Sequence, residues 1–248
     1  MDGQPGIRFH VKHWAAWAPG LTTPEAWTAW ASAPFAPTGL DVPSLSDVPA
    51  MARRRIERLG RLAYHVASSC QGERKGMPAV FASRHGDVAR SVELLSTLAA
   101  GETLSPTSFG LSVHNAIGGQ YSITRQDPSN VVSIAGGPTT AEAAVVEAFG
   151  LLRDGNPEVL LVVYDVSLPS AYAQYADEPA ADFAWAMRLS LPEGPGPALG
   201  LSLEPASRSQ RGNAALPHGL DVLRFFLDPT AELVAPAAGG SWVWTHHG

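Results

Sequence analysis

The sequence predicts a layered α/β fold, in which a mixed sheet has helices packed against it. Residues 159–164 form a continuous apolar run, typical of a strand that is covered on both faces. The segment before it repeats apolar residues at helical spacing and ends at Gly155. Strand-like and helix-like segments alternate along most of the chain, as expected for α/β layers.

The first half of the chain contains most of the clear local patterns. Residues 6–17 are rich in β-branched and aromatic side chains and predict a strand. A short helix is expected over 23–31, where Pro24 stands in the first turn, and a proline-dotted loop over 33–50. Apolar residues then recur at helical spacing and predict a helix over 51–70: Ile56, Leu59, Ala63 and Val66. A strand over 78–83 and a helix over 87–100, ended by Gly101, follow.

Beyond residue 169 the patterns are weaker. They predict strands over 183–191, 198–203 and 241–245, and a helix over 217–227. With 248 residues and 45% apolar side chains, the chain is large enough for a sizeable core, and we expect a single domain over 1–248.

Composition excludes several classes of protein. A net charge of -6 argues against a nucleic-acid binder, which normally has a basic surface. No run of eighteen uncharged apolar residues is present, so we expect no membrane span. The single cysteine, Cys70, permits no internal disulfide, and the first residues lack a basic segment followed by an apolar run. We therefore expect a cytoplasmic protein, with Cys70 a small core residue.

Two segments carry the functional information. Residues 105–119 predict a loop entering a helix and contain His114 and Asn115. Residues 131–140 predict a buried strand that breaks into a helix, with Pro138 in the turn. Thr139 and Glu142 have the spacing of a capping box, in which each side chain would bond a free backbone N–H at the helix start.

These two segments resemble the β-ketoacyl synthase family of the thiolase fold. In that family a strand of the type "SIATAC" delivers a nucleophilic cysteine to the turn before a helix. When Asn115 is aligned with the family's asparagine, Pro138 takes the cysteine position, directly after Gly137. The signatures Ser-Val-His-Asn-Ala and Val-Val-Tyr-Asp are similar to those of the short ketosynthase-like proteins of aryl polyene synthesis, which are viewed as chain-length factors.

The resemblance implies one thiolase-type half without catalytic activity. It covers the first two thirds of the chain well and the last third only by general pattern, and neither histidine motif of the family's second half is found. Proline supplies no thiol and no backbone N–H, so the nucleophile and one oxyanion donor are lost together. The implied function is that of a chain-length factor paired with a catalytic β-ketoacyl synthase, in elongation of a polyketide, aryl polyene or fatty-acyl chain, with no cofactor and no metal. The alternative is a small acyltransferase or hydrolase with a re-evolved serine and His114.

The resemblance also assigns roles to particular positions. The interface strand, expected to lie against the partner, comprises Val131, Val132, Ser133, Ile134 and Ala135. Positions that reach toward the partner's acyl tunnel or the interface are Ser108, Phe109, Val113, His114 and Asn115. Phe109 is either the stop that limits chain length or ordinary packing. His114 is either a hydrogen-bonding residue of the interface, a packing residue of its helix, or a catalytic base.

A run of arginines is open to two interpretations. Arg53, Arg54 and Arg58 lie close together in the sequence and could dock an acidic acyl carrier protein by electrostatic steering. The other interpretation is a solvated helix face.

Overall fold

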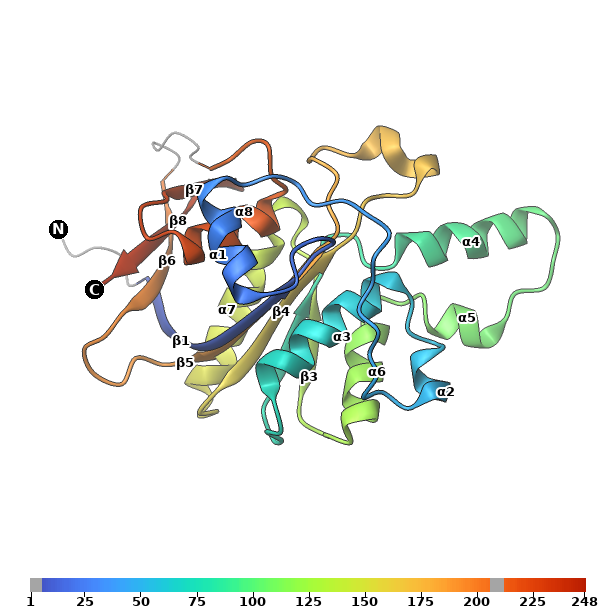
Figure 1. Ribbon diagram of the computed structural model, residues 1–248, viewed down its shortest axis with the longest axis horizontal. Coiled ribbons are helices and arrows are strands. Elements are labelled where there is room, and N and C mark those ends of the chain that lie inside the picture. Colours follow the sequence, from blue (N-terminus) through green and yellow to red (C-terminus); the bar gives the residue numbers. More distant parts are fainter. Residues whose placement is uncertain (1–5, 206–211) are drawn as a thin grey trace.

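A computed structural model describes residues 6–205 and 212–248, which form one eight-stranded mixed sheet with helices on both faces (Figure 1). The strands are β1 (Ile7–Trp17), β2 (Ala79–Ala82), β3 (Val131–Ile134), β4 (Val159–Asp165), β5 (Phe183–Ser190), β6 (Ala198–Glu204), β7 (Leu233–Ala237) and β8 (Gly240–His247). Their order across the sheet is β3-β2-β4-β5-β1-β6-β8-β7. β3, β2 and β4 are parallel, and the remaining neighbours are antiparallel.

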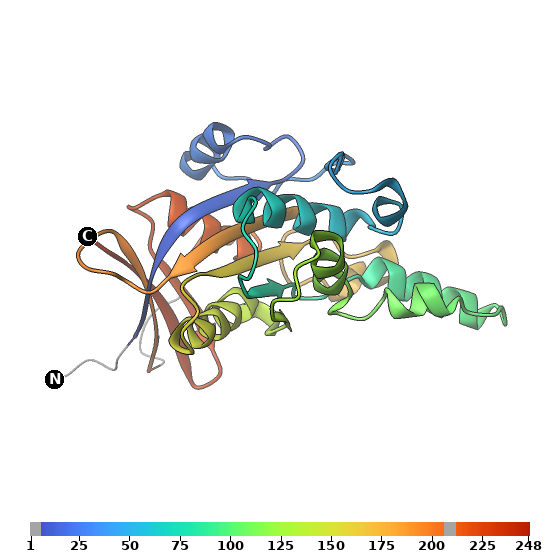
Figure 2. The ribbon, with the colours of Figure 1, turned by 90° about the horizontal axis from the view of Figure 1, so that it is seen from below.

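Two helical layers enclose the sheet. The helices are α1 (Pro24–Ser32), α2 (Ala50–Arg53), α3 (Arg58–Gln71), α4 (Val88–Ala99), α5 (Pro106–Gly110), α6 (Ala116–Arg125), α7 (Thr140–Arg153) and α8 (His218–Leu227), with 3-10 turns η1 (Gly137–Thr139) and η2 (Ser170–Tyr175). Figure 2 shows α3 and α7 on opposite sides of the strands. Within the described residues, no helix is both long and apolar enough to span a membrane.

β4 lies between these layers. Leu160 and Val162 pack in the core formed with α3 and α6, whereas Leu161 and Val163 pack in the core formed with α7 and α8. Both faces of the strand are therefore buried, which explains its continuous apolar sequence.

The predicted helix over 51–70 is interrupted. α2 ends at Arg53 and α3 begins at Arg58, because the backbone turns inward so that Ile56 is buried. The Arg61 side chain compensates by donating to the carbonyl oxygens of Ile56 and Arg53. β7 is short, contains Pro236 and was not predicted from the sequence.

The last third of the chain completes the sheet. β5 pairs with β4 and β1, and β6, β8 and β7 extend the sheet beyond β1. The two edges are therefore β3 and β7. All four residues of β3 are half-buried, and the hydroxyl Oγ of Ser133 is buried without a hydrogen-bond partner.

Residues 87–114, which we call the arm, project from the body of the protein (Figure 2). The arm contains α4 and α5, and neither helix has a buried residue. Four of its large apolar side chains are 47–60% exposed: Leu95, Leu98, Phe109 and Val113. In the isolated chain these side chains are not packed in a hydrophobic core. Exposed apolar side chains grouped in this way are typical of a surface that a partner covers.

Candidate functional site

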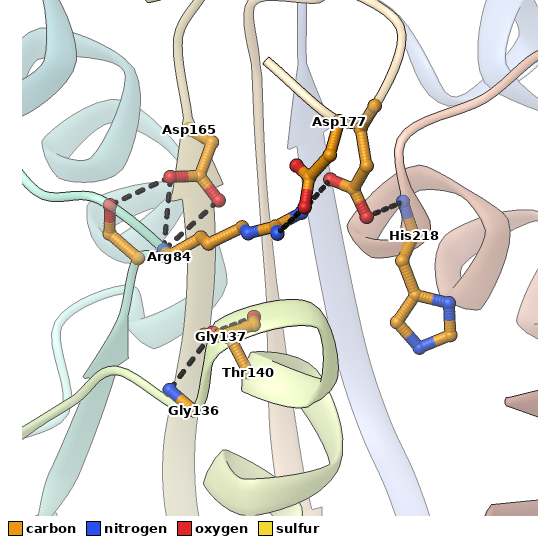
Figure 3. Close-up of polar contacts among 9 residues, drawn as sticks. Arg84, Gly136, Gly137, Thr140, Asp165, Asp177 and His218 are labelled. Carbon is orange, nitrogen blue, oxygen red and sulfur yellow. Dashed lines mark hydrogen bonds and ion pairs between the residues drawn. The ribbon is translucent and has the colours of Figure 1, made fainter. Parts of the chain in front are cut away.

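The turn between β3 and α7 is built around two glycines and a proline. Gly137 has φ +61°, a conformation that side chains with a Cβ rarely adopt, and Pro138 follows in η1. The Thr140 hydroxyl Oγ1 accepts from Gly136 N at 3.0 Å and donates to the Gly137 carbonyl oxygen at 2.8 Å (Figure 3). Pro138 is thereby presented, exposed, at the corner where strand becomes helix.

The predicted capping box is wrong. Thr139 precedes α7, but its side chain makes no capping hydrogen bond and instead donates to the Gly136 carbonyl oxygen. Glu142 is fully buried and points into the protein rather than back to the helix start. Glu142 therefore binds residues distant in the sequence instead of forming the predicted capping box.

Those partners are His218 and Trp244. His218 Nε2 lies 2.7 Å from Glu142 Oε1, and Trp244 Nε1 donates to the same oxygen at 2.8 Å. Burial alone would lower the pKa of His218, but the Glu142 carboxylate, helped by Asp221 and Glu178, outweighs it and raises the pKa above its ordinary value. Through Glu142, these hydrogen bonds join α7 to α8 and β8, close to the turn.

A second carboxylate lies at the end of β4. Asp165 accepts hydrogen bonds from Ser83 Oγ at 2.8 Å and from the Arg84 backbone N–H at 3.0 Å (Figure 3). Burial raises the pKa of Asp165 to about 7, despite these hydrogen bonds, which lower it. At neutral pH this carboxyl is therefore only partly ionised.

Ser83 connects Asp165 to the arm. His114 Nε2 lies 2.9 Å from the Ser83 carbonyl oxygen, and since a carbonyl only accepts, Nε2 carries the proton. The His114 ring also lies against Gly86, where an added Cβ would come within 3.0 Å of it. His114 thus fixes the base of the arm to the end of β2, a contact that sequence patterns did not reveal.

Arg84 lies across the end of the sheet. Its Nη2 is 2.6 Å from Asp177 Oδ2 and its Nη1 is 2.9 Å from Glu178 Oε2 (Figure 3). Glu178 also accepts from the His218 backbone N–H at 3.3 Å. These residues were not among the sequence-predicted site residues, because Arg84 is more than 90 positions away from both carboxylates and the Glu178–His218 contact spans 40 positions.

These groups surround a cavity at the carboxyl ends of β2 and β4. It comprises about 820 Å³ of unfilled space, including its opening to solvent. Gly137, Pro138 and Thr140 form one side, and Asp177, Glu178 and His218 are among the polar residues of another. Much of the remaining lining is apolar: Ala141, Val163, Val166, Leu168, Ala181 and Phe183.

The other predicted site residues lie elsewhere. Ser108, Phe109 and Val113 are on the arm, and Asn115 is exposed at the start of α6, without a capping hydrogen bond from its side chain. Of the predicted interface strand, Val131 to Ile134 form β3 at the sheet edge, and Ala135 follows the strand, exposed. None of these residues lines the cavity at the turn.

The arginines differ from one another. Arg58 is bound internally: its Nη2 is 2.7 Å from Asp182, and Nη1 donates to the Leu40 and Asp41 carbonyl oxygens. Arg53 is half-buried and donates to the Leu45 carbonyl oxygen, while Arg54 is exposed.

Two further observations concern ligands and thiols. Within residues 6–205 and 212–248, no group of three or more His, Cys, Asp or Glu side chains is arranged to hold a metal ion. Cys70 is buried, as predicted, and burial raises the pKa of its thiol to about 12. At neutral pH this thiol is therefore protonated and unreactive.

The turn, the parallel strands β3-β2-β4 and the flanking helices match a known family. Residues 27–245 match the family described as "Beta-ketoacyl synthase, N-terminal domain". The chain therefore belongs to the β-ketoacyl synthase N-terminal domain family. No curated protein matches the chain.

Solved structures show the same fold. A chain of the ketosynthase ApeO in complex with its chain length factor ApeC, from Xenorhabdus doucetiae, is 28% identical with a TM-score of 0.81, over 96% of this chain and 99% of that one. The ishigamide ketosynthase/chain length factor is 14% identical with a TM-score of 0.60, over 80% of this chain and 68% of that one. The ketosynthase of module 1 of the bacillaene synthase from Bacillus amyloliquefaciens is 11% identical with a TM-score of 0.56, over 82% of this chain but 47% of that one. The predicted thiolase-type half is confirmed: this chain corresponds to about half of such a ketosynthase.

Proposed function

We propose that this protein is a noncatalytic ketosynthase-like subunit, a chain-length factor, that pairs with a catalytic β-ketoacyl synthase. The pair would elongate a polyketide, aryl polyene or fatty-acyl chain delivered by an acyl carrier protein, in the cytoplasm. The Xenorhabdus complex, one chain of which aligns with nearly the whole of this one, supports the pairing. The two chains are also similar in length, because the alignment covers 96% of this chain and 99% of the matched one.

One observation carries the noncatalytic assignment: Pro138 occupies the turn between β3 and α7. We infer that it replaces the family's nucleophilic cysteine. A thioester cannot be transferred to a proline side chain, and proline has no N–H to stabilise the oxyanion. The chain would then act by shaping a partner's cavity.

The alternative of a serine–histidine enzyme receives no support from this geometry. A base at His114 would need to face a hydroxyl nucleophile, but its Nε2 is directed to the Ser83 carbonyl oxygen. Both threonine hydroxyls at the turn are bound to the backbone: Thr139 Oγ1 donates to the Gly136 carbonyl oxygen, and Thr140 Oγ1 accepts from Gly136 N and donates to the Gly137 carbonyl oxygen.

Two surfaces are proposed to meet the catalytic partner. The first is the edge strand β3, which is half-buried, uncharged and free of proline, as an edge awaiting a neighbouring strand would be. The second is the arm, whose exposed apolar side chains include Phe109 and Val113. For carrier-protein docking, Arg54 and Arg53 remain candidates, whereas the Arg58 side chain holds the 39–41 loop.

The pairing is tested by placing a charge on the interface strand. Val132→Lys puts an ammonium group at the β3 edge, where strand addition would have to bury it. Co-expression with the neighbouring catalytic ketosynthase, followed by size-exclusion chromatography, should give a complex for the native chain and none for the variant.

The matched control is Ala237→Lys, on the opposite edge strand β7, which should leave assembly unchanged. Equal assembly of all three proteins would reject β3 as the interface. Turnover of an acyl thioester by the isolated native chain would reject the noncatalytic assignment.

A further inference from the structure

A largely apolar cavity lies beside the turn that contains Pro138. The part of this space that a solvent-sized group can occupy is about 140 Å³, room for a short apolar fragment, and its apolar walls suit an alkyl group. In a complex with a partner that elongates acyl chains, an accessible cavity of this kind would compete with the partner for binding the acyl chain.

Arg84, Asp177 and Glu178 form what we call the ion-pair bar. Figure 3 shows the extended Arg84 side chain running from the Asp165 side toward Asp177, above Gly137 in this view, and all three residues line the cavity. The Arg84 side chain is only 11% exposed, and each of its terminal nitrogens faces a separate carboxylate, at 2.6 and 2.9 Å. The bar therefore links the end of β2 to the segment before β5.

The bar is anchored at both ends. The Arg84 backbone N–H donates to Asp165, and Glu178 accepts from the first residue of α8, His218. Two charge-assisted hydrogen bonds in a partly buried position hold the guanidinium in one orientation. An entering alkyl chain would have to displace the Arg84 guanidinium from Asp177, which is 61% exposed, and from Glu178, which is 27% exposed. The cost of this separation lies mainly in leaving the largely buried guanidinium without a partner.

We propose that the ion-pair bar closes an apolar cavity against acyl chains, so that Arg84 is a specificity-determining residue that confines the growing chain to the catalytic partner. This inference rests on the proposed function for its biological meaning. The closure itself is a property of the isolated chain.

The test uses the isolated full chain and the uncharged apolar fluorophore N-phenyl-1-naphthylamine. The native protein should show no saturable binding, whereas Arg84→Ala should bind one probe per chain at least tenfold more tightly. A neutral octanoyl thioester should displace the probe from the variant, as expected if the opened cavity accepts an acyl chain.

The control is Arg224→Ala, which removes an arginine paired with Asp221 and Asp228 on α8, outside the cavity lining. If Arg84→Ala does not fold, the double variant Asp177→Asn with Glu178→Gln releases the guanidinium instead, and it should open the cavity equally.

Probe binding by the native chain as tight as by the variants, or no gain in a folded variant, would overturn the closure. Because no partner is present, these results do not depend on the assembly experiment. A chain that fails to pair with a ketosynthase would refute the proposed function while leaving the closure measurable.

Discussion

The buried charge at Glu142 makes stability depend on the protonation of His218. The folded-state pKa of His218 is raised, so the imidazolium–carboxylate pair is complete below its ordinary pKa of 6.5 and is lost as pH rises through the folded value. Asp165 acts in the same direction: its folded pKa of about 7 exceeds the ordinary 3.8, so stability declines as the pH rises between them. The Asp165 contribution cancels when variants at position 218 are compared.

His218→Gln should keep a donor near Glu142 but remove the positive charge. We expect it to lower the free energy of unfolding by about 2 kcal/mol at pH 6, the scale of a hydrogen bond to a charged group, and by much less at pH 9. Chemical denaturation at both pH values measures this, with His13→Gln, at an exposed position of β1, as the control. A difference that is the same at both pH values would contradict the ionic account.

Phe109 is 60% exposed, so it is not core packing in this chain. If it limits the product in the assembled complex, Phe109→Ala should lengthen the product by removing a bulky stop, while turnover continues. Mass spectrometry of the products measures this, and Phe35→Ala, also exposed but in the 33–49 loop, is the control. Unchanged product length with the complex intact would remove Phe109 from this role.

At the scale of single residues, local signals determined what could be predicted. The turn at Pro138 was placed correctly, because an apolar strand precedes it and a strongly patterned helix follows it. Glu142 was misassigned, because Thr-x-x-Glu is a local pattern whereas its true partner His218 lies 76 positions later. Arg84 and Ser83 gave no sequence signal, since only the folded sheet brings them to Asp165.

Among the elements, β3 and α6 fit closely together. A Cβ at Gly118 would lie 2.7 Å from Val131 Cγ1, closer than atoms pack, so the helix can approach the edge strand only because residue 118 is glycine. This contact holds the strand that is proposed to face the partner.

Gly118→Ala should therefore lower the free energy of unfolding by about 1–3 kcal/mol, the usual range for overpacking. The adjacent Gly119 has nothing within 4 Å of an added Cβ, so Gly119→Ala should be neutral or stabilising through its better helix propensity. Thermal denaturation of both variants measures the contrast. If Gly118→Ala were stabilising instead, β3 would be able to move away from α6 at little cost in free energy.

Elements with strong periodicity were predicted well, and the exceptions have physical causes. β4, β5 and α7 bury whole faces, which leaves clear apolar patterns. Residues 51–70 kept a helical pattern across a break, because Ile56 is buried from a turn rather than from a helix. β7 contains Pro236, a residue that argues against a strand except at a sheet edge, which is where it lies.

For the whole molecule, the arm is the part that its own core does not stabilise. Leu95 and Leu98 lie three positions apart on α4, on the same side of the helix, and both are more than half exposed. We infer that this side of α4 becomes buried only in the complex.

The double variant Leu95→Ser with Leu98→Ser should leave the melting temperature of the isolated chain nearly unchanged, because no buried contact is lost. Its affinity for the catalytic ketosynthase should fall at least tenfold, through loss of apolar area buried at the interface. Isothermal titration calorimetry measures this, with Leu203→Ser on β6 as an exposed apolar control. If the double variant bound with unchanged affinity, this side of α4 would not be part of the interface.

The proline in β7 has a consequence for stoichiometry. A chain whose sheet could be extended from both sides would be able to polymerise into open-ended rows. Pro236 withholds an amide hydrogen on one flank, so growth is permitted only on the other. We therefore expect a closed one-to-one pair instead of a filament, however concentrated the two proteins become.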